Sequence, residues 1–328
     1  MIKLIKRLAL FAFILGLLLF FSYRINSIFF NEYNYSPPDS VVTIVTGSSV
    51  VTDGINPIWI HKACNIALSQ EPMSISYLKL RDLLTSPNNR VERVILSFSL
   101  IETNPEFDEV FNESRENSVE MFSRVSFLRQ DVPFRFFAPY HPSKLDYFEV
   151  YLRNRVFPVW PLIVNSVSND SLCFPHIGGF NDHDEFNTRK AVIEKRDYQK
   201  ISGKYFDPLK EDCCVSKTNS LYLDSIINLT KKLNVDLFLV GMPMHVELYD
   251  KVPDFNLEFY YSRAREATSY DHVFFWDFSR CLKSHGLFKD HLHLSRSGAD
   301  SISKMINDSI LHYSSMNKEV KWTSLKPD

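Results

Sequence analysis

Residues 41–49 of the chain are Val-Val-Thr-Ile-Val-Thr-Gly-Ser-Ser, six β-branched side chains followed by a glycine and two serines. β-branched residues favour a β-strand because their side chains pack well on a pleated surface. Gly47 interrupts this pattern, and a glycine allows the sharp backbone turn at which a strand ends. We therefore expect a buried strand over residues 41–46, with the hydroxyl group of Ser49 projecting from its carboxyl end.

Further segments of strand type and helix type alternate through the rest of the chain. Short, largely apolar runs alternate with segments in which apolar residues recur at helical spacing. This alternation favours a mostly parallel sheet with helices on both faces, and ligands bind beyond the carboxyl ends of the strands in such sheets. The expected strands are 41–46, 65–69, 91–100, 235–240 and 272–276. The expected helices are 57–63, 73–84, 218–233, 258–267 and 295–311.

The alternation is lost between about residues 104 and 216. This stretch is rich in aromatic residues and contains polar, loop-like pieces such as Gly178-Gly179-Phe180-Asn181-Asp182. It is too long for one loop, because structureless loops in compact domains seldom exceed about 15 residues. We expect an insertion that packs over the strand-end edge of a domain covering residues 41–315, and we expect residues 316–328 to form a tail.

The first 23 residues predict a membrane-spanning segment. Residues 1–7 carry three basic side chains, and residues 8–23 are apolar almost throughout, close to the length of about 20 residues that spans a bilayer. A cleaved signal peptide has a similar start, but residues 20–26 lack the small-residue pattern of a cleavage site. We therefore favour an uncleaved single-pass anchor, with residues 1–7 in the cytoplasm and the domain on the periplasmic or extracellular side. Residues 24–40 would form a tether.

Composition excludes some partners. The formal net charge is −2 and the basic residues are scattered along the chain, so we expect no nucleic acid partner. There are five cysteines, which in an oxidising compartment allow one or two disulfides. The adjacent pair Cys213-Cys214 lacks the spacing of a zinc site, and we predict neither a metal nor a cofactor.

A second informative segment lies near the carboxyl end of the chain, where Asp290 and His293 stand three residues apart before an expected helix. A serine nucleophile needs a base to accept its proton, and the base needs a carboxylate to fix its tautomer. A D-x-x-H segment can supply both groups from one turn. The same spacing also arises by chance, and Ser295 beside it is a suitable helix cap.

The serines after the first strand are the candidate nucleophile. The glycine lets the backbone turn sharply, and a helix beginning nearby would offer N–H groups to an oxyanion. Gly47-Ser48-Ser49 is also a common sequence for a simple turn at a strand end. The two segments together therefore support catalysis more strongly than either segment does alone.

Together, the G-x-S segment and the segment D-x-x-H-L-x-x-x-G-A at residues 290–299 resemble the first and last blocks of the SGNH/GDSL hydrolase family. The resemblance implies a flavodoxin-like three-layer α/β/α fold with a mostly parallel five-stranded sheet. It also implies that Ser49 is the nucleophile, His293 the base and Asp290 the residue that orients it.

The chain is most similar to a membrane-anchored bacterial branch of this family. In that branch the first block reads Gly-Ser-Ser and the next strand ends in an N-x-A-L-S segment, here Asn65 to Ser69. The resemblance implies an acylated cell-envelope glycan or polymer as substrate, acetyl as the acyl group and a membrane-embedded acyltransferase as a partner.

The chain also departs from the family pattern. Ser69-Gln70 stands where the second block offers a glycine, and the G-x-N-D sequence of the third block is missing after the third strand. The oxyanion donors would then be the backbone N–H of Ser49 and a group from residues 69–71, such as the side chain of Gln70. The expected oxyanion and substrate-binding residues are Gly47, Ser48, Ser69, Gln70 and His245. For His245, the sequence fits a substrate contact and an ordinary loop histidine equally well.

Two functions follow from these observations. The first is a membrane-anchored serine acyl-esterase or O-acyltransferase that acts on an envelope glycan through an acyl-Ser49 intermediate. The second is a catalytically inactive protein that keeps the fold as a scaffold in a complex for polysaccharide modification or export. The missing family motifs favour the second function, whereas the presence of serine, histidine and aspartate together favours the first.

Overall fold

The computed structural model describes residues 2–32, 40–87, 89–105, 179–181, 215–315 and 322–324. The chain divides into two compact units, residues 1–36 with 112–171 and residues 37–111 with 172–328. Most of the expected insertion at 104–216 lies outside the described residues. So do Cys173, Cys213 and Cys214, and within the described part of the chain Cys64 and Cys281 form no disulfide.

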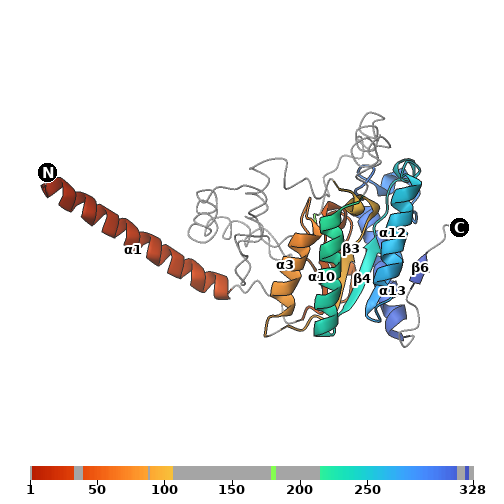
Figure 1. Ribbon diagram of the computed structural model, residues 1–328, viewed down its shortest axis with the longest axis horizontal. Helices are drawn as coiled ribbons and strands as arrows, with labels where there is room; N and C mark the ends of the chain where they lie inside the picture. The colour runs from red at the N-terminus through yellow and green to blue at the C-terminus, as the bar shows by residue number, and fades with distance from the viewer. Residues whose placement is uncertain are drawn as a thin grey trace. The chain divides into compact units, whose positions relative to one another are not determined.

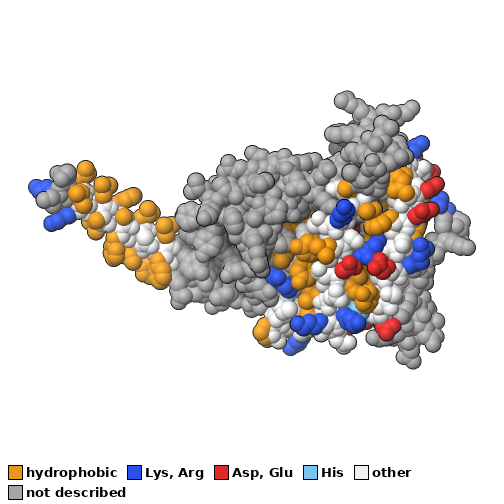
Figure 2. Space-filling view, in the orientation of Figure 1, with side chains coloured by type: hydrophobic (Ala, Val, Ile, Leu, Met, Phe, Trp, Pro, Cys, Tyr) orange, Lys and Arg blue, Asp and Glu red, His pale blue; other side chains and the backbone are white. Residues whose placement is uncertain are grey.

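The first unit contains the helix α1 (Ile2–Glu32). Its segment Lys3–Phe21 is long and apolar enough to cross a membrane, by length and composition, and a signal sequence would meet the same test. Apolar side chains cover the visible side of this helix, and basic side chains lie at its amino end (Figure 2). The helix extends to Glu32, so it includes residues that we had expected to belong to the tether.

The second unit is an α/β domain built on a parallel sheet, as the alternating pattern predicted (Figure 1). All neighbouring strands pair in parallel, in the order β2-β1-β3-β4-β5-β6. The first five strands thus have the order 2-1-3-4-5 of flavodoxin-like sheets. The strands are β1 (Thr43–Thr46), β2 (Ala63–Asn65), β3 (Arg93–Ser97), β4 (Asp236–Gly241), β5 (Val273–Asp277) and β6 (Trp322–Ser324).

Several elements differ from the sequence-based expectation. The helix expected at 57–63 is only the short 3₁₀ helix Pro57–Trp59, because the chain enters β2 at Ala63. The strand expected at 91–100 is limited to Arg93–Ser97, and a 3₁₀ helix begins at Leu100. The second strand was expected at 65–69 and instead covers Ala63–Asn65, because the side chain of Asn65 accepts the N–H of Ala67 at 2.9 Å and turns the chain there. The sixth strand lies within the expected tail. It is only three residues long, too short to leave a periodic pattern in the sequence.

Helices cover both faces of the sheet. The helices are α2 (Ser49–Thr52), α3 (Met73–Leu84), α10 (Lys217–Leu233), α11 (Val246–Tyr249), α12 (Asp254–Ala267) and α13 (Arg296–Ser315). Short 3₁₀ helices are η1 (Pro57–Trp59), η2 (Leu100–Thr103) and η7 (His285–Leu287). Figure 1 shows α3, α10 and α12 side by side on one face of the sheet.

Alternating side chains of β5 show how the two layers form. Phe274 packs against Tyr313 of α13, with ring centroids 4.4 Å apart, whereas Phe275 packs against Tyr260 of α12 at 5.6 Å. Successive residues of a strand point to opposite faces, so α13 covers the face opposite α12. Both faces are buried, which explains why the strands are almost continuously apolar in sequence.

Candidate active site

Ser49, His293 and Asp290 form one continuous chain of hydrogen-bonding groups. The Oγ atom of Ser49, the first residue of α2, lies 2.8 Å from Nε2 of His293. On the other side of the ring, Nδ1 of His293 lies 2.8 Å from Oδ2 of Asp290. Ser49 and His293 are 244 residues apart in sequence, and the fold brings them to the same edge of the sheet. This is the order and spacing that a nucleophile, a base and an orienting carboxylate require.

The electrostatic environment of His293 favours its role as a base. Burial by itself lowers the pKa of His293, but the hydrogen bond and the charge of Asp290 outweigh it and raise the pKa above its ordinary value. Burial by itself raises the pKa of Asp290, and the contacts with His293 outweigh it and lower that pKa. Asp290 therefore stays ionised and stabilises the imidazolium that forms when His293 accepts a proton.

Gly47 sets the turn that presents Ser49. Its φ angle is +141°, a region that residues with a side chain rarely adopt. A Cβ atom at this position would lie 2.3 Å from Cβ of Ser97, at the end of the neighbouring strand β3. Gly47 thus contributes to the site through its backbone, by letting β1 pass close to β3 and turn at once into α2.

Ser48 does not face the site, contrary to the expectation that it contacts the substrate. Its side chain is fully buried and donates a hydrogen bond of 2.6 Å to Oε1 of Glu102. The Oε2 atom of Glu102 accepts the hydroxyl of Ser97 at 2.8 Å and the backbone N–H of Ser99 at 2.8 Å. Burial raises the pKa of Glu102, against the effect of these hydrogen bonds. Ser48 and Glu102 together brace the turn beneath Ser49.

Ser69 and Gln70 lie exposed in a turn beside the loop that carries Ser49. The N–H of Leu68 donates to the carbonyl oxygen of Gly47 at 3.2 Å, and the N–H of Glu71 donates to the carbonyl oxygen of Leu68 at 3.2 Å. Gln70 has a φ angle of +56°, the left-handed conformation that a glycine adopts most easily. The turn therefore has at Gln70 the backbone conformation that is most typical of a glycine.

A buried ion pair fixes this turn from below, and sequence reasoning missed it. Oε2 of Glu71 lies 2.6 Å from Nζ of Lys79 on α3, and both side chains are fully buried. Lys79 also donates to the carbonyl oxygen of Ile66, while Oε1 of Glu71 accepts the hydroxyl of Ser76 at 2.6 Å. The only local sign of this pair is a glutamate just before the helix and a lysine within it, and the helix also carries Arg81 and Asp82.

The described part of the expected insertion, residues 179–181, lies against α2. The N–H of Asn181 donates to the carbonyl oxygen of Thr52 at 2.9 Å, and its side-chain amide donates to Oδ1 of Asp53 at 2.9 Å. Oδ2 of Asp53 lies 3.4 Å from Nζ of Lys289, the residue before Asp290. Asp53 thus links the helix of the nucleophile, the insertion and the loop of the base.

His245 does not join the triad, and its side chain is fully buried rather than presented to a substrate. Its Nε2 atom lies 2.9 Å from Nδ1 of His285, and its ring packs at right angles to that of His291, with centroids 5.5 Å apart. Burial, followed by the charge of His285, lowers the pKa of His245. These contacts join His245 to His285 and His291 rather than to Ser49.

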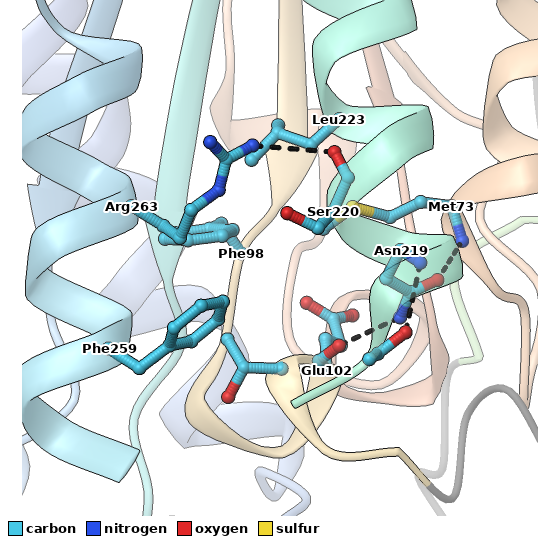
Figure 3. A pocket seen from close by; sticks show the side chains of 10 residues that line it. Met73, Phe98, Glu102, Asn219, Ser220, Leu223, Phe259 and Arg263 are labelled. Carbon is cyan, nitrogen blue, oxygen red and sulfur yellow. Dashed lines mark hydrogen bonds between the residues drawn. The ribbon is translucent and has the colours of Figure 1, made fainter. Parts of the chain in front are cut away.

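A small pocket opens elsewhere, between α10, α12 and η2 (Figure 3). Its empty space, including the open mouth, is about 230 Å³, and neither Ser49 nor His293 lines it. The Nη2 atom of Arg263 reaches across it to the carbonyl oxygen of Ser220 at 3.3 Å. Glu102, which accepts the hydrogen bond from Ser48, also lines this pocket. The pocket is therefore next to the buried contact of Ser48 and is not part of the triad. Its lining residues are Met73, Phe98, Glu102, Thr103, Ser216, Asn219, Ser220, Leu223, Phe259 and Arg263.

The fold and this geometry define an α/β protein with a serine–histidine–aspartate triad at the carboxyl edge of a parallel sheet. A scan against models of known protein families finds no match for the chain, and a search of curated proteins finds none either. The fold and the site geometry therefore carry the functional argument.

Proposed function

We propose that the protein is a serine acyl-esterase or O-acyltransferase that works through an acyl-Ser49 intermediate. The observation that supports this most strongly is the hydrogen-bonded chain from Ser49 Oγ through both ring nitrogens of His293 to Asp290, with 2.8 Å at each step. The resemblance of the same two segments to the SGNH/GDSL hydrolases agrees with this chemistry.

The two half-reactions use the same groups. Ser49 Oγ attacks the acyl carbonyl carbon while His293 Nε2 accepts the hydroxyl proton, and Asp290 stabilises the imidazolium. When the ester C–O bond breaks, His293 returns the proton to the leaving alcohol and the acyl group stays on Ser49. Water then takes the acyl group in an esterase, or a sugar hydroxyl takes it in a transferase, with His293 acting as the base again.

The developing oxyanion needs donors near Ser49. We infer that one donor is the backbone N–H of Ser49 at the start of α2 and that a second comes from the turn of Ser69 and Gln70, which is tied to Gly47 through Leu68. Removing one oxyanion donor costs about 10²–10³ in turnover. The left-handed backbone of Gln70 supports this inference, because a glycine adopts that conformation most easily.

The substrate and the location are inferred from α1 and from the resemblance. A single-pass anchor with its amino end in the cytoplasm would hold the domain at the outer surface of the membrane. The substrate would then be an acylated cell-envelope glycan, with acetyl as the acyl group and a membrane-embedded acyltransferase as the partner. Esterase and transferase share the acyl-enzyme step and differ only in the acceptor.

Hydrolysis of p-nitrophenyl acetate by the full-length chain in detergent tests the nucleophile. The Ser49→Ala variant should lose most of the hydrolysis, a fall of at least about 10³-fold, and keep only the residual rate that binding and the oxyanion donors supply. Ser225→Ala, which removes an exposed hydroxyl on α10 that bonds only its own helix, is the matched control and should keep full activity. Equal hydrolysis by wild type and Ser49→Ala would favour the scaffold function instead.

A further inference from the structure

Three histidines and a glutamate meet where the loop after β4 contacts the loop of the triad base. His245 comes at the end of the β4 loop, Glu247 is in the first turn of α11, and His285 begins η7. His291 lies between Asp290 and His293. The backbone N–H of His245 donates to the carbonyl oxygen of His291 at 3.0 Å, so the two loops are held in contact at this point.

The distances between the side chains suit a single ion. One ligand atom each from His245, Glu247 and His291 lie within 4.8 Å of one another, and Nε2 of His291 is 3.8 Å from Oε2 of Glu247. Around a tetrahedral zinc ion, ligand atoms at bond lengths of about 2.0–2.2 Å are about 3.4 Å apart. The side chain of Glu247 is 57% exposed, so a rotamer change can bring its carboxylate the remaining distance.

The hydrogen bonds around His245 indicate which nitrogen would bind. Its Nδ1 atom accepts the N–H of Glu247 at 3.3 Å, so the neutral ring carries its proton on Nε2. That proton is donated to Nδ1 of His285, 2.9 Å away. A metal-binding histidine commonly donates its second N–H to such an outer partner, which fixes the tautomer and the ring orientation. His245 would therefore bind through Nδ1, whose lone pair would exchange the long hydrogen bond from Glu247 N–H for the metal ion, with His285 as the outer partner.

We propose that His245, Glu247 and His291 bind one divalent transition metal ion of the zinc class. Two imidazoles and one carboxylate are a ligand set that zinc accepts, and three protein ligands leave one coordination position for water. Both histidines are fully buried, so they stay in place when the ion is lost. The spacing of these residues along the chain matches no simple metal motif, which is why the sequence predicted no metal.

The ion would connect the β4 loop to the loop that carries Asp290 and His293. Its role is structural, because the histidine that it fixes, His291, is not a member of the triad. Metal binding at these residues does not depend on the acyl transfer proposed above. A failure to bind metal would therefore leave the proposed esterase function untouched, and a failure to hydrolyse esters would leave the metal site untouched.

The full-length chain in detergent, stripped with a chelator and then titrated with Zn²⁺ against a chromophoric competitor, tests this site. We expect about one tightly bound ion per chain. The Glu247→Gln variant should bind at least about 100-fold more weakly, since loss of even an outer-shell partner costs about 10–100-fold. This exposed position tolerates the change without unfolding. Glu258→Gln, at an exposed position on α12, is the matched control and should bind as wild type does.

Replacement of Zn²⁺ by Co²⁺ gives a second readout that does not depend on affinity. The visible absorption of Co²⁺ bound to wild type should show the strong bands of a four-coordinate site with nitrogen ligands, and His291→Ala should lose them. Absence of stoichiometric binding, or equal affinity in wild type and Glu247→Gln, would overturn the proposal.

Discussion

At the scale of single residues, Asp290 holds His293 in two ways. Its Oδ2 atom accepts the ring N–H of His293, while its Oδ1 atom accepts the backbone N–H groups of Leu292 and His293, each at 2.8 Å. The carboxylate therefore fixes both the loop and the orientation of the ring. The same contacts lower the pKa of Asp290 against the opposing effect of burial.

The variant Asp290→Asn should lower kcat/KM for ester hydrolysis by about 10³–10⁴-fold, because the ring loses its preferred tautomer. It should also shift the pH profile. His293 must be neutral to accept a proton, so activity rises as pH increases through its pKa. Burial by itself lowers the pKa of His293, but the contacts with Asp290 outweigh burial and raise this pKa above its ordinary value. Removing the charge therefore moves the acidic limb of kcat/KM to lower pH.

The matched control for this pH profile is Asp308→Asn, an exposed carboxylate on α13. Its profile should coincide with that of wild type. An acidic limb in Asp290→Asn that stays where it is in wild type would show that His293 is not the titrating base.

Gly47→Ala should destabilise the domain by about 2–5 kcal/mol, because the new Cβ meets Cβ of Ser97 at 2.3 Å and the positive φ angle is strained. Thermal unfolding in detergent measures this as a lower midpoint. Gly286→Ala is the control, since its Cβ would meet nothing closer than 3.9 Å. Equal midpoints for the two variants would contradict the close approach of β1 and β3 at Gly47.

At the scale of elements, the turn after β2 is held to α3 by the buried pair of Glu71 and Lys79, 2.6 Å apart. Thr46 at the end of β1 also donates to Oε1 of Glu71, at 3.3 Å. A single buried carboxylate therefore joins a strand, a turn and a helix next to the site. Buried pairs of this kind fix geometry more than they add stability.

Lys79→Met should cost about 3–5 kcal/mol of unfolding free energy, because it leaves the charge of Glu71 buried without its partner. The double variant Glu71→Gln/Lys79→Met should recover part of that loss, since neither charge remains. Chemical unfolding of wild type, Lys79→Met, Glu71→Gln and the double variant measures the coupling. Glu266→Gln is the control, because the side chain of Glu266, which pairs with Arg263, is 64% exposed. This change should alter the unfolding free energy by about 1 kcal/mol or less. A double variant no more stable than Lys79→Met would contradict the pairing.

Local sequence patterns were enough to predict the strand β1 and the alternation of strands and helices, and the resemblance of two short segments was enough to expect Ser49, His293 and Asp290 to lie together. The supporting contacts could not be predicted, because tertiary packing decides which polar side chains are buried and where they point. Ser48 and Glu102 are 54 residues apart, and only the folded sheet shows that Ser48 points inward.

At the scale of the whole chain, the described residues form an apolar helix and an α/β domain. The alternation in the sequence predicted the parallel sheet, and the strand order 2-1-3-4-5 of the first five strands agrees with the flavodoxin-like fold that the resemblance implied, whereas β6 leaves no pattern that could predict it. The helix α1 reaches Glu32 and contains the apolar segment Lys3–Phe21. Its length and composition fit both an anchor and a signal sequence, and the two differ in whether α1 remains in the mature chain.

We expect the mature protein to retain α1. It should stay with the membrane fraction through high-salt and alkaline washes and be released only by detergent, because about 20 apolar residues anchor a chain that charge contacts alone would not hold. Intact mass spectrometry of the released protein should give the mass of the chain with Lys3–Phe21 present. A mature chain that begins after Phe21 would contradict the anchor and identify α1 as a cleaved signal peptide.

Covalent trapping tests most directly whether Ser49 is a nucleophile that His293 activates. A fluorophosphonate probe reacts with an activated serine by forming a P–O bond and releasing fluoride, and peptide mass spectrometry locates the adduct. We predict a single adduct on Ser49 in the full-length chain, absent in Ser49→Ala and strongly slowed in His293→Ala. A protein that stays unmodified, or that is labelled as fast without His293, would contradict the account.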